Sequence, residues 1–393
     1  MPGAVLHHAV LPHRGGAVRV ARLLIEAQKM AGHEARLSFE VPENDPEPIA
    51  AATQAAFPLC GPTPPGDIGR SLAQLPQDAI LHLHSSTDWP ALLAGLLPQA
   101  AGRTVLVTLH DATPLTGGCA YPLDCPHFPT CADPCPRLFR DAQARQMEIA
   151  ARLRRLGQAA AVAIISPSRW LAGLARQVWP GIPAHIIPNG VPWPELAAVP
   201  SRAKARQTLG LEPGARVALF AAHGGARAAY KSGPSWPDYW RRLREALPQA
   251  VGFAVGGDEA GNRDGLTIWP YVNREKLRLL MRAADALLYP TLADNHPLVL
   301  LEAAALELPV ASFAVGGVPE IVLNGETGLL TPAGDADAFQ RAALDLLGDP
   351  ARSRRLGRAA RAHGAKRFTA ARMAADYAER ADKTPAPQTP ADK

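Results

Sequence analysis

The feature that most constrains the fold is an alternation of short apolar segments with longer helical ones, in two successive runs. Apolar segments bounded by turn residues are typical of strands buried on both faces, and strands that alternate with helices form parallel sheets. The expected strands are 4–8, 35–41, 79–83, 104–108, 162–166 and 184–187 in the first run, and 216–221, 252–255, 266–269, 286–289, 310–313 and 328–330 in the second. The expected helices are 17–31, 89–97, 137–156 and 168–177, then 237–247, 274–284, 298–306 and 336–347. The pattern predicts an α/β protein with a parallel sheet in each half.

The length of 393 residues also favours two domains, because single cores usually stop growing near about 250–300 residues. A proline-rich, polar stretch lies between the two runs and breaks any long helix. The expected organisation is an N-terminal domain over 1–195 with a cysteine-rich loop at 117–136, a linker over 196–214, a C-terminal domain over 215–365, a helix over 366–382 that packs back on the N-terminal domain, and a disordered tail over 383–393.

Composition excludes several classes of protein. With 47% hydrophobic and 20% charged residues, the chain is neither disordered nor fibrous. No apolar run approaches the roughly 20 residues of a membrane span, and the first residues do not form a secretory leader, so we expect a cytoplasmic protein. The net charge of +5 fits either a solvated arginine-rich surface or attraction to a nucleotide or an anionic membrane. Nucleic acid is not expected as a partner, because no basic stripe carries interleaved aromatics.

Ligands of open parallel sheets bind beyond the carboxyl ends of the strands, so polar residues at those junctions are the candidates for a site. After strand 286–289, a loop presents Asp294 and Asn295, and Glu302 follows in the next helix. Two carboxylates there can accept hydrogen bonds from sugar hydroxyls, and the open N–H groups of a helix start suit a phosphate. The alternative is a capping aspartate with a surface glutamate.

Two junctions of the first half carry candidates as well. Gly15 and Gly16 follow the first strand, where glycines either let backbone N–H groups approach a phosphate or simply form a turn. His110 and Asp111 follow strand 104–108. We interpret His82 and His84 as structural. We also do not assign a metal to His7, His8 and His13, because they lack supporting ligands at a suitable spacing.

These junctions resemble a known family. The seven-residue separation of Asp294 and Glu302, the LEA that ends this segment and the turn at 316–320 are similar to the donor-binding signature of retaining family-4 glycosyltransferases. The segments at 81–84, 166–176, 187–191 and 205–211 resemble blocks of that family in the same order. The DN-x-P form resembles the branch associated with colanic-acid and other exopolysaccharide synthesis. The resemblance covers nearly the whole chain and implies a GT-B fold, in which two Rossmann-like domains face a central cleft.

The resemblance also implies roles for single residues. Asp294 and His110 would contact the donor sugar, and Glu302 would bind the ribose. Asn295, with Gly316 and Gly317 of the following turn, would complete the donor site. Departing diphosphate needs cations, and the family supplies an adjacent arginine and lysine after the first strand of the second domain.

This chain departs from the family at the cationic loop. Lys231 matches the lysine, Tyr230 stands in the arginine's place, and we expect Arg227 to substitute for that arginine. Glu307 is a second departure, since the family usually has a small glycine there.

Four of the five cysteines lie in one proline-rich loop, namely Cys119, Cys125, Cys131 and Cys135. Such a loop could be ordered by a structural zinc ion, but the spacing lacks a CxxC pair, and unligated reduced thiols are the alternative. An iron–sulfur cluster is the third interpretation.

The sequence therefore predicts a retaining glycosyltransferase that moves a hexose-type sugar from a nucleoside-diphosphate donor to a saccharide or lipid-linked acceptor, without a catalytic metal. A sugar-nucleotide epimerase of the same fold and a catalytically silent binding homologue stay open as alternatives. The arginine-rich segment 137–157 is either a solvated helix face or a peripheral contact with an anionic membrane at its inner face.

Overall fold

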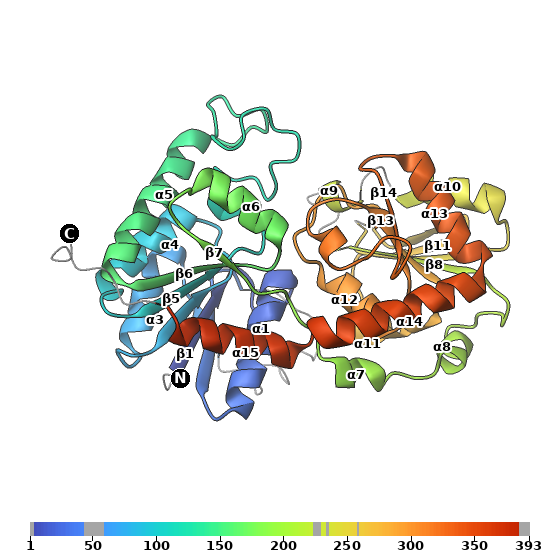
Figure 1. Ribbon diagram of the computed structural model, residues 1–393, viewed down its shortest axis with the longest axis horizontal. Coiled ribbons are helices and arrows are strands. Elements are labelled where there is room, and N and C mark those ends of the chain that lie inside the picture. Colours follow the sequence, from blue (N-terminus) through green and yellow to red (C-terminus); the bar gives the residue numbers. More distant parts are fainter. Residues whose placement is uncertain (1–3, 43–58, 223–228, 233–235, 258, 385–393) are drawn as a thin grey trace. The chain divides into compact units, whose positions relative to one another are not determined.

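A computed structural model describes residues 4–42, 59–222, 229–232, 236–257 and 259–384 (Figure 1). The chain divides into two compact units. Unit 1 comprises Met1–Asn189 and Ala370–Lys393, and unit 2 comprises Gly190–Thr369. The boundary therefore lies at Asn189, a few residues before the predicted one at 195. The predicted linker is also part of unit 2, because helix α8 (Arg202–Thr208) packs on α11 (Arg274–Ala283).

Unit 1 contains a seven-stranded sheet in the order β3-β2-β1-β4-β5-β6-β7, with all neighbours parallel. Its strands are β1 (Ala4–Ala9), β2 (Glu34–Phe39), β3 (Leu59–Pro62), β4 (Ile80–Leu83), β5 (Thr104–Thr108), β6 (Ala161–Ser166) and β7 (Ala184–Ile186). The sequence patterns did not predict β3. The strand order reverses between β1 and β4, so the ligand-binding end of this sheet is expected beyond these two strands.

The helices of unit 1 are α1 (Gly16–Met30), α3 (Ile68–Ala73), α4 (Trp89–Leu96), α5 (Ala142–Ala159), α6 (Arg169–Val178) and α15 (Ala370–Asp382), with short 3-10 turns η1 (Pro65–Asp67), η2 (Leu97–Gln99) and η3 (Thr113–Leu115). Helix α5 begins five residues later than predicted, because the carboxylate of Asp133 accepts hydrogen bonds from the backbone N–H groups of Ala142 and Gln143.

The C-terminal helix α15 packs within unit 1. It contacts α1, and the hydroxyl of Tyr377 lies 2.9 Å from Oγ1 of Thr108 at the end of β5. Arg380 lies 3.2 Å from the ring of His185 in β7. Helices α1 and α15 therefore cover the face of the sheet toward which the central histidines point.

Unit 2 has a second seven-stranded sheet, in the order β10-β11-β9-β8-β12-β13-β14. Its strands are β8 (Val217–Ala221), β9 (Val251–Val255), β10 (Gly261–Arg263), β11 (Leu266–Trp269), β12 (Ala286–Tyr289), β13 (Val310–Phe313) and β14 (Leu329–Thr331). All pairs are parallel except the edge pair β10 and β11, and β10 was not predicted. Here the order reverses between β8 and β12.

Side chains of unit 2 alternate between two cores on opposite faces of this sheet. In β8, Val217 and Leu219 belong to one core while Ala218 and Phe220 belong to the other. A strand buried on both faces reads as a continuous apolar run, which is why its position was predictable.

The helices of unit 2 are α7 (Trp193–Ala197), α8, α9 (Ala229–Ser232), α10 (Trp236–Ala246), α11, α12 (Leu298–Ala305), α13 (Ala336–Gly348) and α14 (Pro350–Arg367), with the 3-10 turn η5 (Val318–Glu320). The polar, arginine-rich α14 was not predicted as a separate helix; it packs on α12. Within the described residues of both units, no helix combines the length and apolar composition of a membrane span.

Candidate functional site

In unit 2, the predicted donor residues gather where the strand order reverses. The loop after β12 is held against α9, which follows β8 along the chain, by two contacts to the carbonyl oxygen of Tyr230. The N–H of Leu292 donates to it at 2.6 Å and Oγ1 of Thr291 at 3.2 Å. Because β8 and β12 are neighbours in the sheet, this pairing brings Lys231 beside the loop that carries Asp294.

The carboxylate of Asp294 is buried, and both of its oxygens have partners. One oxygen, Oδ2, accepts a hydrogen bond from the hydroxyl of Tyr289 at 2.7 Å and lies 3.4 Å from Nζ of Lys231. The other, Oδ1, accepts from the backbone N–H of Asn295 at 2.8 Å. Burial and the neighbouring Asp294 carboxylate hold the pKa of Tyr289 well above its usual range, so this hydroxyl remains a donor. Asp294 therefore fixes the position of the Lys231 ammonium.

The glycine turn predicted at 316–317 lies directly against this aspartate. The N–H of Gly317 donates to the carbonyl oxygen of Asp294 at 2.9 Å. Gly316 has a φ of 58°, and a Cβ at this position would lie 2.1 Å from the same oxygen. Only glycine fits here, so the turn supports the loop instead of acting through a side chain of its own.

Helix α12 begins at residue 298, as predicted, and Glu302 lies in its second turn. Its side chain is only 7% exposed, and Oε1 lies 3.4 Å from the guanidinium of Arg274, which is half exposed. Asn295 is also buried. The structure thus gives both predicted carboxylates, Asp294 and Glu302, a cationic neighbour. Lys231 and Arg274 are cations that can face an anionic ligand.

The sequence patterns did not single out Tyr289 or Arg274. Tyr289 is the last residue of β12 and was interpreted only as part of a strand; Arg274 opens α11 after its capping residue Asn273. A polar atom at the carboxyl end of a central strand was the available signal for Tyr289. The predicted contribution of Arg227 lies outside the described residues.

In unit 1, the predicted phosphate loop follows β1. Gly15 has a φ of 100° and precedes the first residue of α1, Gly16. Neither glycine has an atom within 4 Å of the position that a Cβ would occupy. For Gly15 the positive φ, and not lack of space, is therefore the reason for glycine.

His110 and Asp111 have different roles in the structure. Oδ1 of Asp111 accepts from the backbone N–H and hydroxyl of Thr113 at 2.9 and 2.6 Å and so closes the turn η3. Nε2 of His110 lies 3.0 Å from Nδ1 of His84. His110, partly buried, is the outermost ring of a row of histidines that continues into the protein.

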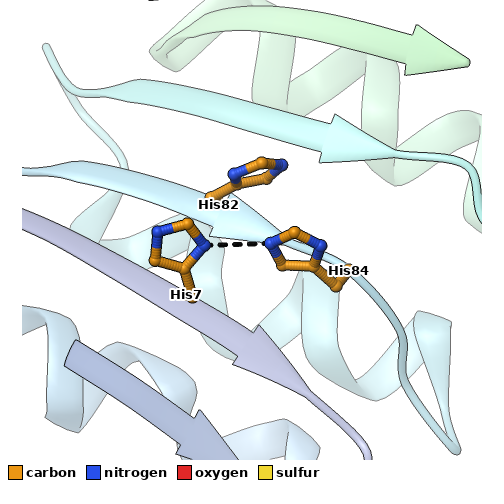
Figure 2. A group of neighbouring side chains, drawn as sticks. All are labelled: His7, His82 and His84. Atoms are coloured by element: carbon orange, nitrogen blue, oxygen red, sulfur yellow. Dashed lines mark hydrogen bonds between the residues drawn. The ribbon is translucent and has the colours of Figure 1, made fainter. Parts of the chain in front are cut away.

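This row crosses from β4 to β1, the two strands where the order reverses. Nε2 of His84 lies 2.9 Å from Nδ1 of His7, and the ring of His82 lies beside both (Figure 2). Burial lowers the pKa of His7 to about 4, although a hydrogen bond with Gln28 raises it, and burial lowers the pKa of His110 to about 3. Burial, and then the neighbouring rings, hold the pKa values of His82 and His84 well below the usual range. These four rings are neutral at pH 7.

His8 belongs to a separate network on the other face of β1. Its ring lies 2.8 Å from Oγ of Ser38 and 3.2 Å from Oε1 of Glu40. Burial alone would raise the pKa of Glu40, but hydrogen bonds from His8, Ser86 and Thr87 lower it. The sequence patterns did not identify Glu40. Within the described residues, the group that could hold a metal ion is His7, His82 and His84, not the set of His7, His8 and His13 considered from the sequence.

The cysteine loop carries the four thiols for which a structural zinc was predicted. All four cysteines are free, and no three of them belong to a group of ligand atoms within 4.8 Å of one another in the described part of the chain. Sulfurs on one tetrahedral zinc lie about 3.8 Å apart, from a Zn–S bond of roughly 2.3 Å. Burial raises the pKa of Cys119 to about 11 and also raises that of Cys131. Both the structural zinc and the unligated thiols therefore stay predictions for this loop.

The arginines of α5 form pairs inside unit 1. Arg145 lies 3.6 Å from Asp88, and Arg152 contacts Glu148 and the carbonyl oxygen of Pro90. Nothing in these contacts identifies a membrane surface.

Both halves of the chain match known families. Residues 14–192 match the family model described as Glycosyltransferase Family 4, and residues 257–363 match the model described as Glycosyl transferases group 1. The chain is 40% identical over 103 residues to D-inositol 3-phosphate glycosyltransferase of Streptomyces avermitilis, which is 26% of this chain and 22% of that protein. It is 32% identical over 227 residues to the protein of the same name from Xylanimonas cellulosilytica, 51% of this chain and 52% of that one. The matched regions span about half or less of these relatives.

Solved structures with the same fold cover nearly the whole chain. Sucrose-phosphate synthase (tll1590) from Thermosynechococcus elongatus has a TM-score of 0.68 and 22% identity, over 96% of this chain and 98% of that one. Anabaena Alr3699/HepE in complex with UDP and glucose has a TM-score of 0.71 and 16% identity, over 96% and 99%. The fold is therefore GT-B, with two Rossmann-like domains.

Proposed function

We propose that this chain, which belongs to the GT-B glycosyltransferases of group 1 and family 4, transfers a hexose-type sugar from a nucleoside-diphosphate donor to a saccharide or lipid-linked acceptor with retention of configuration. The proposal includes a role in polysaccharide or glycoconjugate synthesis in the cytoplasm, at the inner face of a membrane. The colanic-acid and exopolysaccharide branch is the proposed place within the family.

The observation that carries this proposal is the pair formed by Lys231 and Asp294, beyond β8 and β12, where the strand order of unit 2 reverses. A lysine whose Nζ lies 3.4 Å from the carboxylate of a buried aspartate is a positive charge held at one place, which suits a diphosphate whose charge grows as it leaves. Glu302, buried beside Arg274, supplies a second carboxylate for ribose hydroxyls. The Anabaena HepE structures with UDP and UDP-glucose support a uridine nucleotide as the first donor to test.

The proposed reaction breaks the bond between the anomeric carbon and the diphosphate oxygen while the acceptor hydroxyl attacks from the same face. The departing phosphate oxygen takes the proton of that hydroxyl, and the products are a glycoside and a nucleoside diphosphate. In this scheme Lys231, with Arg227 as its proposed partner, stabilises the leaving group, and no catalytic metal is needed. Asp294 orients Lys231 and, together with His110, faces the sugar.

Calorimetry with UDP, GDP, ADP and TDP tests the donor site directly. Lys231→Met and Glu302→Ala should each weaken binding of the preferred nucleotide about 10- to 100-fold, the range of a lost charge-assisted hydrogen bond. Lys204→Met and Glu326→Ala are matched controls, since both residues are exposed on unit 2, and should leave affinity unchanged.

Three outcomes separate this proposal from its alternatives. Absence of binding to all four nucleotides would identify a silent homologue. Conversion of donor without any acceptor would identify an epimerase. Transfer with an inverted anomeric centre, read by NMR of the product, would contradict retention while leaving transferase activity intact.

A further inference from the structure

Four side chains of unit 1 form a continuous row of hydrogen bonds that ends at His110. Oε1 of Gln28 in α1 lies 2.9 Å from Nε2 of His7. Nδ1 of His7 lies 2.9 Å from Nε2 of His84, and Nδ1 of His84 lies 3.0 Å from Nε2 of His110. Each inner ring uses both of its nitrogens, and His7 and His84 are 0% and 1% exposed.

The first residue of the row sets the direction of every bond in it. The amide oxygen of Gln28 can only accept, so Nε2 of His7 carries the proton. A neutral imidazole has one donor and one acceptor nitrogen, and the low pKa values given above keep these rings neutral. Nδ1 of His7 then accepts from Nε2–H of His84, and Nδ1 of His84 accepts from Nε2–H of His110. The last ring is left with its lone pair on Nδ1.

We infer that Gln28, His7 and His84 are positioning residues that fix His110 in the tautomer with the proton on Nε2 and the lone pair on Nδ1. The consequence for chemistry rests on the proposed function. In this tautomer Nδ1 of His110 accepts a hydrogen bond and cannot donate one, so the ring suits a group that donates, such as a hydroxyl, and does not suit a phosphate oxygen. The fixed tautomer therefore supports the sugar-facing role already proposed for His110.

His82 braces this row from the side. Its ring lies 4.0 Å from that of His84 and 5.0 Å from that of His7, centroid to centroid (Figure 2). Nε2 of His82 lies 2.8 Å from Oγ1 of Thr108, which in turn lies 2.9 Å from the hydroxyl of Tyr377 in α15. The C-terminal helix therefore contributes to holding the rings in register.

A metal ion bound by His7, His82 and His84 is the competing interpretation of the same cluster. Two nitrogens on one tetrahedral zinc lie about 3.3–3.4 Å apart, from a Zn–N bond of roughly 2.0–2.1 Å. The 2.9 Å separation of His7 Nδ1 and His84 Nε2 is the usual length of a hydrogen bond instead. The geometry therefore favours a shared proton.

Nitrogen NMR of the full-length protein, labelled with ¹⁵N-histidine, tests the inference without relying on activity. Long-range proton–nitrogen correlations report which ring nitrogen is protonated, and a His110→Phe spectrum assigns the signals. We expect His110 in wild-type protein to show a protonated Nε2 and an unprotonated Nδ1. A protonated Nδ1 would overturn the inference. So would stoichiometric metal in the purified protein that is lost in a His7→Gln variant.

Variants of Gln28, at the start of the row, test whether the direction of its hydrogen bond determines the tautomer of His110. Gln28→Leu removes the first acceptor and should convert His110 to a mixture of tautomers, with about a tenfold loss in kcat/KM. Gln28→Glu keeps an acceptor and should retain the wild-type tautomer. Gln77→Leu is the matched control, because the Gln77 amide donates to the carbonyl oxygen of Ala101 outside the row, and it should change neither readout. An unchanged tautomer in Gln28→Leu would contradict transmission, whereas absence of all transferase activity with the expected tautomers would refute only the proposed function.

Discussion

Each unit has a point at which its strand order reverses, between β1 and β4 in unit 1 and between β8 and β12 in unit 2. These two switch points share a topology and differ in their electrostatics. In unit 1 the central strands β1 and β4 carry a row of neutral, hydrogen-bonded histidines, of which His7 and His84 are buried. In unit 2 the loops beyond β8 and β12 carry charged pairs, Lys231 with Asp294 and, nearby, Arg274 with Glu302. The comparison teaches that one fold can place either neutral acceptors or fixed cations at the same topological position.

This difference follows from burial. The histidines of β1 and β4 point into the sheet's covered face, where charging a ring would cost its hydration. Lys231 in the short helix α9 and Arg274 at the start of α11 keep part of their surface in water. A neutral site discriminates by donor and acceptor direction, whereas a charged site attracts an anion from a distance.

Acidification should produce the largest effect on this comparison. The folded pKa of His7 is about 4 and that of His110 about 3, below the value of roughly 6.5 in an unfolded chain. The unfolded chain therefore binds more protons between pH 6.5 and about 4, and the free energy of unfolding falls as pH drops through that window, on the order of 3 kcal/mol for His7 alone.

Hydrogen-exchange mass spectrometry, corrected for intrinsic exchange rates, can measure this loss in each unit separately. We expect protection in unit 1 to decrease more than protection in unit 2 between pH 7 and pH 5. A His82→Gln variant removes one titrating ring and should make the dependence shallower. Equal losses of hydrogen-exchange protection in the two units would contradict the predicted difference in their electrostatics.

Gly316→Ala should have the next largest effect, this time in unit 2. The new Cβ would meet the carbonyl oxygen of Asp294, and the residue would keep a φ of 58°. We expect the free energy of unfolding to fall by about 3 kcal/mol, as overpacking adds to left-handed strain. Nucleotide binding should weaken too, because the loop of Asp294 must move.

Gly325→Ala is the control for strain alone. Gly325 has a φ of 78°, but no atom lies within 4 Å of the position that a Cβ would occupy, so its cost should be about 1 kcal/mol. If urea denaturation gave the same loss in free energy of unfolding for both variants, the loop of Asp294 would be able to move away from the new Cβ without cost.

Glu307→Gly should have a smaller effect of opposite sign. Glu307 has a φ of 59° just after α12, where glycine is preferred. Its contact with Arg361 is 3.8 Å long and exposed, and is worth little. The variant should gain about 1 kcal/mol of stability, with unchanged nucleotide affinity. Glu307→Ala, which retains the strain, should show no such gain; a change in affinity would place Glu307 in the site.

Metal removal should have the smallest effect. If the loop cysteines are free thiols, a chelator should leave the unfolding of unit 1 unchanged. Titration with a thiol reagent should then show that only burial slows the reaction of these cysteines in the native protein, compared with the denatured protein. Elemental analysis should give no stoichiometric zinc. One zinc per chain, released together with the four loop thiols, would restore the zinc interpretation.

The central strands were predictable from sequence because their apolar runs are buried on both faces. The strands 104–108, 266–269, 286–289 and 310–313 have the predicted bounds. The short edge strands β3, with the sequence LCGP, and β10, with the sequence GNR, were missed because neither contains a continuous apolar run. The start of α5 was misplaced because the side chain of a distant residue, Asp133, binds its first N–H groups.

For the site, the sequence and its resemblance to family-4 glycosyltransferases pointed to Asp294, Glu302, Lys231 and His110, each in a segment that follows a predicted strand. Tertiary structure decided their partners. The hydroxyl of Tyr289, the guanidinium of Arg274 and the path from Gln28 to His110 join residues from separate elements. Local periodicity records which face of an element is buried, but a hydrogen bond between elements depends on strand order and register, which only the assembled sheet sets.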